Sequence, residues 1–118
     1  MQNYKDLKGW QKAHTLTLIG YKITRCFPKE ETFGITSQMR RASASVPANI
    51  AEGCGRITRP DIANFFQIAL GSLHELEYYA LLAHDLHYVN ATEFKEMDSL
   101  LKETKAMLVS LIKKTRSA

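Results

Sequence analysis

Apolar residues recur at steps of three and four along most of this chain, which is the spacing of one face of an α-helix. The pattern predicts four helices, at about residues 7–26, 32–53, 60–87 and 92–115. The repeat is most regular in the last two helices, where it runs in heptad register. The core positions expected there are Ile62, Phe66, Ala69, Leu73, Leu76, Ala80, Ala83 and His87, followed by Phe94, Met97, Leu101, Thr104, Leu108 and Leu111. No stretch alternates with period two, so no strand is expected.

The first two helices carry shorter apolar stripes. In the second helix the stripe predicts a buried face made of Ile35, Met39, Ala42, Val46 and Ile50. In the first helix the same reasoning assigns Leu7, Trp10, His14, Leu18 and Tyr21 to the core.

Polar residues mark three of the expected helix starts. Asp6 is a plausible N-cap for the first helix, and Thr58 or Arg59 caps the third. Asn90, with Glu93 three residues later, has the spacing of a capping box at the start of the fourth helix.

The second helix contains a proline, Pro47, and ends in glycines. A proline inside a helix removes one backbone hydrogen bond and crowds the preceding turn, so a kink is expected near residues 43–46. Gly53 and Gly55 are expected to end this helix in the left-handed conformation that glycine tolerates. Small residues around the proline indicate either a close helix crossing in the core or a subunit interface.

These elements predict a single all-α domain over residues 1–118, an up-and-down antiparallel four-helix bundle with a proline-kinked second helix. The chain has 118 residues, of which 45% are hydrophobic, which is enough for one globular core. Its first ten residues lack the apolar run of a signal peptide, and no stretch is apolar enough to cross a membrane. The cysteines, Cys26 and Cys54, have no metal-binding or disulfide spacing, so a cytoplasmic location is expected.

No catalytic, metal or cofactor site is specified by residue spacing. A di-iron bundle requires Glu-x-x-His pairs, whereas Tyr78 stands three residues after Glu75. His84 and His87 lack a third ligand, and Cys54 between two glycines has no partner base. The expectation is a protein that is not an enzyme and takes no cofactor.

Positive charge is concentrated in the first half of the sequence. Residues 1–60 contain ten lysines and arginines against four acids, and residues 61–118 contain six against eight. This asymmetry suits either a surface that binds polyanions or an assembly in which basic and acidic faces meet. The residues expected to contact phosphates are Lys8, Lys12, Lys22, Arg40, Arg56 and Arg59. For the loop that holds Arg56 and Arg59, a solvated basic connection is the alternative.

Arg41, Asn49 and Glu52 form a second candidate cluster on the second helix. An inward-facing arginine requires a carboxylate partner. We therefore predict either a buried polar network that fixes the register of the bundle or a subunit interface.

One long string in this sequence is a specific family signal. The segment 38–53, QMRRASASVPANIAEG, followed by Arg56 and by the segment 65–77, FFQIALGSLHELE, resembles the signature of bacterial four-helix-bundle proteins encoded in intervening sequences of 23S ribosomal RNA genes. The resemblance extends to Leu7, Trp10, Gln11, Lys12 and Ala13 and to Phe27, Pro28 and Glu31, whereas His74 and the segment after Leu86 match loosely.

The resemblance implies an up-and-down bundle assembled as a ring-like homopentamer. The fold is also similar to that of the accessory protein of diversity-generating retroelements, a basic pentamer that works with nucleic acid, although a shared fold does not establish a shared function. The leading hypothesis is a non-enzymatic, oligomeric protein that binds RNA or DNA through its basic surface. The alternative is a scaffold for protein interactions, or an accessory subunit, with no direct contact to nucleic acid.

Overall fold

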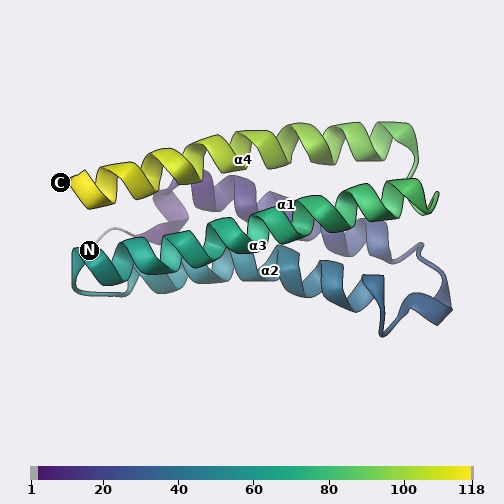
Figure 1. Ribbon diagram of the computed structural model, residues 1–118, viewed down its shortest axis with the longest axis horizontal. Coiled ribbons are helices and arrows are strands. Elements are labelled where there is room, and N and C mark those ends of the chain that lie inside the picture. The colour runs from purple at the N-terminus through teal and green to yellow at the C-terminus, as the bar shows by residue number, and fades with distance from the viewer. Residues whose placement is uncertain (1–2, 118) are drawn as a thin grey trace.

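The computed structural model describes residues 3–117, which form four α-helices and two single-turn 3₁₀ helices. The α-helices are α1 (Lys8–Thr24), α2 (Ile35–Cys54), α3 (Arg59–Asp85) and α4 (Ala91–Ser117), and the 3₁₀ helices are η1 (Tyr4–Asp6) and η2 (Lys29–Glu31). The four α-helices run antiparallel along a molecule 45 Å long, which confirms the predicted bundle (Figure 1). The second helix begins three residues later than predicted because residues 32–34 form a turn and Gly34 occupies the N-cap position.

Each helix packs against two neighbours. Both α1 and α3 contact α2 and α4, and α1 does not contact α3 within the described residues. The two helices α1 and α3 therefore lie diagonally across the bundle and run in the same direction. Their first residues share one end of the molecule with the last residues of α2 and α4 (Figure 1).

The core is made by the stripes predicted for α2, α3 and α4. All five predicted stripe positions of α2 are buried, and Leu73 and Leu76 of α3 belong to the same buried cluster as Leu101 and Leu108 of α4. His87 is the exception, because it lies beyond the end of α3 and is exposed.

The stripe predicted for α1 is confirmed only at its start, where Leu7 and Trp10 pack against the core, and is wrong at His14, Leu18 and Tyr21, which are exposed. The buried face of α1 consists of Gly9, Ala13, Leu16, Gly20, Ile23 and Thr24. The small residues permit a close approach to α2: a Cβ atom on Gly20 would lie 3.2 Å from Ser43 Oγ, and Thr17 Oγ1 donates a hydrogen bond of 2.8 Å to Ser43 O. As a result, Leu18 is 58% exposed and Tyr21 is 41% exposed.

Two of the three predicted caps are confirmed. At the start of α4, Glu93 N donates to Asn90 Oδ1 at 2.7 Å, and Asn90 N donates to Glu93 Oε1 at 3.0 Å. At the start of α3, Asp61 N donates to Thr58 Oγ1 at 3.3 Å. Asp6 does not cap α1, because it lies in η1 and Leu7 occupies the N-cap position.

The end of α2 depends on close contact rather than on an unusual glycine conformation. The helix continues through Pro47 to Cys54, and the predicted kink stays a prediction. Within residues 3–117 no glycine has a positive φ, so the predicted left-handed glycine stop is wrong. Gly53 is instead needed for space, since a Cβ atom there would lie 2.8 Å from Phe66 Cε1.

Candidate functional site

The antiparallel topology collects positive charge at one end of the bundle. Residues 3–15, 46–71 and 105–117 belong to the half of the molecule where α1 and α3 begin and α2 and α4 end. These segments, called the basic end below, contain nine lysines and arginines against three acids, whereas the remaining charged residues are seven basic and nine acidic. The cations of the basic end are Lys5, Lys8, Lys12, Arg56, Arg59, Lys105, Lys113, Lys114 and Arg116.

Arginines from two helices share a hollow at the basic end. A hollow of about 510 Å³ is lined by Arg59, Asn64 and Arg116. Arg59 is the first residue of α3, and Arg116 lies in the last turn of α4. Arg116 Nη2 donates a 2.6 Å hydrogen bond to Gln67 Oε1, which fixes its guanidinium next to α3. Two arginines therefore line one hollow, and guanidinium groups are well suited to bind phosphate.

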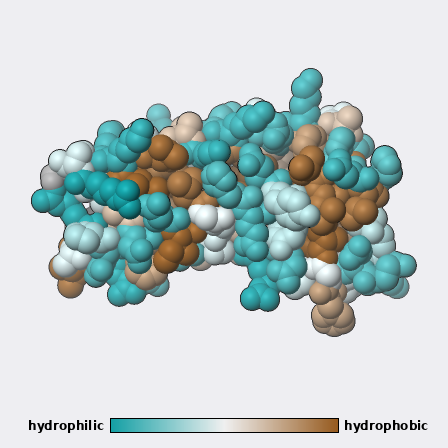
Figure 2. Space-filling view, in the orientation of Figure 1, coloured by the Kyte–Doolittle hydropathy of each residue, from teal (hydrophilic) through white to brown (hydrophobic). Residues whose placement is uncertain are grey.

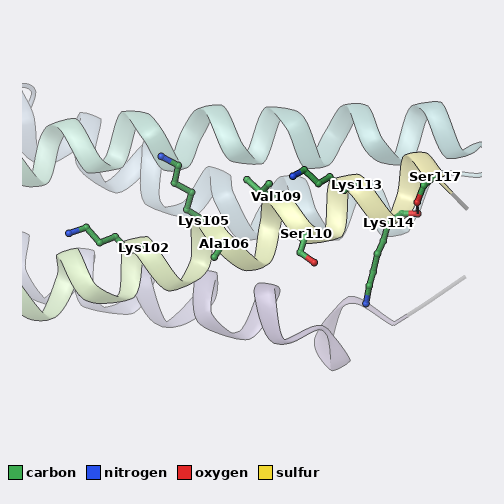
Figure 3. Close-up of a pocket in the computed structure, with 8 residues that line it drawn as sticks. All are labelled: Lys102, Lys105, Ala106, Val109, Ser110, Lys113, Lys114 and Ser117. Carbon is green, nitrogen blue, oxygen red and sulfur yellow. Dashed lines mark hydrogen bonds between the residues drawn. The ribbon is translucent and has the colours of Figure 1, made fainter.

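Lysines line the neighbouring surface between α1 and α4. Lys8 and Lys114 border a groove of about 360 Å³, and Lys8 and Lys12 border a second of about 370 Å³. A third depression, of about 760 Å³, is lined entirely by residues of α4, which Figure 3 draws as sticks. Lys114 points to one side of α4 in that view, and Lys105 and Lys113 point to the other, so cations flank a strip of small side chains.

Four of the six predicted phosphate-contacting residues belong to the basic end. Lys8 and Arg59 are exposed. Lys12 pairs with Glu103 Oε2 at 2.7 Å. Arg56 Nε lies 3.4 Å from Glu52 Oε2, and its guanidinium carbon lies 4.5 Å from the centre of the Phe65 ring.

The other two predicted residues, Lys22 and Arg40, lie in the opposite half of the bundle. Arg40 Nε donates a 2.7 Å hydrogen bond to Thr24 Oγ1, and its guanidinium carbon lies 4.9 Å from the centre of the Tyr21 ring. The fold therefore separates these two cations from the basic end and gives Arg40 a role in holding α1 against α2.

Sequence reasoning missed the four cations that α4 contributes to the basic end, which are Lys105, Lys113, Lys114 and Arg116. The second half of the sequence is acidic on average, and this average conceals a basic C-terminal segment. Antiparallel packing of α4 places that segment next to the first turns of α1 and α3. The net charge of each half-helix, counted separately, is the sequence signal that indicates this basic segment.

Two exposed apolar strips lie on the diagonal helices. The α1 strip consists of Leu18 and Tyr21 with the cations Lys22 and Arg25 beside them. The α3 strip consists of Tyr78 and Leu81, which are 57% and 46% exposed, with the acids Glu75 and Asp85 beside them. Figure 2 shows a hydrophobic area over the C-terminal part of α3. Both strips occupy the half of the bundle opposite the basic end.

The predicted cluster of Arg41, Asn49 and Glu52 is not a buried network within the chain. Arg41 and Glu52 are exposed, because they project from the outer surface of α2, and Asn49 Nδ2 donates to Ser45 O at 2.8 Å. Arg41 lines a polar hollow of about 210 Å³ with Glu75, at the edge of the α3 strip. The alternative assignment, a subunit interface, stays a prediction.

Three further properties of the chain bear on its chemistry: metal ligands, the pKa of Lys102 and the hydropathy of the helices. Residues 3–117 contain no group of three or more His, Cys, Asp or Glu side chains arranged to hold a metal ion. A hydrogen bond to Asp98 raises the pKa of Lys102, which lines the α4 depression. In the same part of the chain no helix is both long and apolar enough to span a membrane.

Comparison with models of protein families shows to which family this chain belongs. The model of the 23S rRNA-intervening sequence protein family matches residues 5–110, which includes all of the first three helices and most of the fourth. The chain belongs to this family. Three cations of the basic end, Lys113, Lys114 and Arg116, lie beyond the part that matches the family model. No curated protein matches the chain.

A solved structure supports the fold of this family member. It is the crystal structure of a protein of unknown function from the S23 ribosomal protein family of Bacteroides thetaiotaomicron VPI-5482. That structure is similar to this chain with a TM-score of 0.82 at 24% sequence identity, over 89% of this chain and 98% of the other. The likeness establishes the bundle and says nothing about what the chain binds.

Proposed function

We propose that this family member is a non-enzymatic, homo-oligomeric protein that binds RNA or another nucleic acid through the basic end. The observation that carries the proposal is the gathering of nine of the sixteen lysines and arginines at one end of the bundle, where seven of them line hollows. Cations distributed over several helices can contact successive phosphates and release the counterions condensed on them. Recognition of this kind depends on the phosphate backbone more than on the bases.

The test is a salt titration of binding by the purified protein to 23S rRNA fragments and to an unrelated RNA. The logarithm of the binding constant is expected to fall linearly with the logarithm of the salt concentration. Replacing Arg59 and Lys114 together by glutamine is expected to weaken binding and to reduce the slope by about two, because each cation that binds a phosphate contributes roughly one to the slope.

The matched control replaces Lys29 and Lys95, two exposed lysines of the opposite half that lie outside both apolar strips, by glutamine. This variant has the same net charge as the first and is expected to keep nearly all of the wild-type affinity and slope. Equal weakening in both variants would show that net charge alone attracts RNA. Absence of binding by the wild-type protein at low salt would overturn the proposal.

Assembly is the second part of the proposal. The α1 strip is apolar and basic, and the α3 strip is apolar and acidic, so the two strips are complementary between neighbouring copies. They lie on different helices, and contact between different surfaces generates a ring when the rotation closes. Because both strips lie in the half opposite the basic end, parallel copies would bring their basic ends together. Five copies is the number that the family resemblance implies.

The alternative function, a scaffold for protein interactions without a nucleic-acid role, is favoured by the same exposed strips. It predicts an intact oligomer that binds neither RNA at low salt. A cytoplasmic location belongs to both proposals, because the two cysteines are free and Cys26 is exposed.

A further inference from the structure

The turn between α2 and α3 places a large apolar side chain, Ile57, among the cations of the basic end. Ile57 is 94% exposed, and Arg56 and Arg59 stand on either side of it in the sequence. Single exposed apolar residues are common on protein surfaces, so exposure alone assigns no role. Ile57 differs from an ordinary exposed apolar residue because it lies at the tip of a strongly basic surface.

The backbone on both sides of Ile57 is held in place. Arg56 N donates a 3.0 Å hydrogen bond to Gly53 O, which fixes the last turn of α2. Thr58 caps α3 on the other side. Gly53 packs directly against Phe66, so the two helices cannot separate here without disrupting the core. The turn therefore presents the Ile57 side chain to solvent and does not let it fold back onto the bundle.

Charge and shape together indicate what this side chain contacts. The basic end attracts phosphates. The apolar surfaces that a nucleic acid offers are the faces of its bases, which become accessible where stacking is interrupted. Proteins that bind the minor groove of DNA insert apolar side chains, isoleucine among them, between base steps and unstack them. We propose that Ile57 inserts beside an unstacked base, so that the protein prefers a nucleic-acid helix interrupted by an unpaired nucleotide over a perfect helix.

This inference rests on the proposed function and is tested by a ratio of two affinities. Binding is measured with a fully paired RNA hairpin and with the same hairpin carrying one bulged nucleotide, at one salt concentration. The wild-type protein is expected to bind the bulged hairpin about tenfold more tightly, which is the effect of burying part of one aliphatic side chain. Ile57→Ser is expected to reduce this preference to about one, and Ile57→Leu is expected to retain it.

The matched control is Phe33→Ser. Phe33 is also 94% exposed, but it precedes α2 at the opposite end of the bundle, beside Glu30 and Glu31. This variant is expected to keep the preference of the wild-type protein. A fluorescent base analogue next to the bulge provides a direct readout, because its emission rises when the base is unstacked by wild-type protein and is expected to stay low with Ile57→Ser.

The outcomes separate the inference from the proposed function. If wild-type protein binds both hairpins equally, or if Ile57→Ser keeps the preference, the wedge is overturned and phosphate binding stands. If wild-type protein binds neither hairpin, the proposed function fails and the wedge fails with it. Because Ile57 is exposed, thermal melting of Ile57→Ser is expected to match that of the wild-type protein, so a reduced preference is not explained by unfolding.

Discussion

Gly53 and Gly71 occupy very different surroundings in neighbouring helices. A Cβ atom on Gly53 would lie 2.8 Å from Phe66 Cε1 and 3.2 Å from the backbone oxygen of Ile62, whereas a Cβ atom on Gly71 would meet nothing within 4 Å. Gly53→Ala is therefore expected to lower the free energy of unfolding by about 1–3 kcal/mol through overpacking. Gly71→Ala, in the exposed interior of α3, is expected to raise it by about 0.5–1 kcal/mol.

Urea denaturation of the two alanine variants at the same pH measures both effects. The opposite signs make the pair its own control, because both changes add one methyl group to a glycine in a helix. An unchanged or increased stability of Gly53→Ala would contradict the close approach between the end of α2 and the start of α3.

The buried thiol of Cys54 links stability to alkaline pH. Burial raises the pKa of the Cys54 thiol above its ordinary value of 9.0. The folded protein thus holds this proton to a higher pH than the unfolded chain, so its contribution to stability is complete below about pH 9 and is lost as the pH rises through the folded-state pKa.

Unfolding free energies of wild-type protein and Cys54→Ala, measured at pH 7.5 and at pH 10, test this linkage. The difference between the two proteins is expected to shrink at the higher pH. Cys26→Ala removes the exposed thiol and is expected to leave the pH dependence of the wild-type protein unchanged. A constant difference between wild-type protein and Cys54→Ala would show that the thiol does not titrate in this range.

At the scale of the helix, the start of α4 depends on a reciprocal pair of hydrogen bonds. Asn90 accepts from Glu93 N, and Glu93 accepts from Asn90 N. Asn90→Ala removes the side-chain acceptor and is expected to destabilise the protein by about 1 kcal/mol, the usual contribution of an N-cap. The thermal midpoint by circular dichroism measures this destabilisation.

The control for this cap is Thr92→Ala, which changes an exposed residue of the same first turn. Thr92→Ala is expected to shift the midpoint much less than Asn90→Ala. Equal shifts in the two variants would indicate a general sensitivity of this turn and would contradict a specific capping contribution.

Helix positions and most caps could be predicted from the sequence because they depend on local spacing. The face of α1 could not, because its contact with α2 is made by Gly20 and Ser43, residues that carry no hydrophobic signal. Periodicity identifies the most apolar face, whereas close packing selects the face with the smallest side chains. The apolar stripe that remained outside, around Leu18 and Tyr21, is the α1 strip of the proposed interface.

At the scale of the whole molecule, the basic end could be predicted only in part. Lys8 and Arg59 were found from the basic half of the sequence, but Lys114 and Arg116 were not. Charge along a chain becomes charge on a surface only after the topology is known, and here four antiparallel helices bring three separated segments together. Successive helices of the bundle run in opposite directions. Adding the charges of the first halves of α1 and α3 to those of the second halves of α2 and α4 therefore identifies the same end.

The two strips make a prediction about assembly that separates a ring from a symmetric pair. If the α1 strip of one copy contacts the α3 strip of the next, Leu18→Glu and Leu81→Glu each block one of the two faces. Each variant alone is expected to be monomeric, because a carboxylate at the centre of an apolar contact loses its hydration on burial. Phe33→Glu, which lies in neither strip, is expected to assemble like the wild-type protein.

Mixing the two monomeric variants in equal amounts gives the decisive result. The intact α3 strip of Leu18→Glu can contact the intact α1 strip of Leu81→Glu, and the other two faces stay blocked. The mixture is therefore expected to form complexes of two chains and nothing larger, as measured by light scattering after gel filtration. If the α1 strips paired with each other, Leu81→Glu alone would form a dimer and mixing would add nothing, because a two-fold interface uses the same surface on both copies.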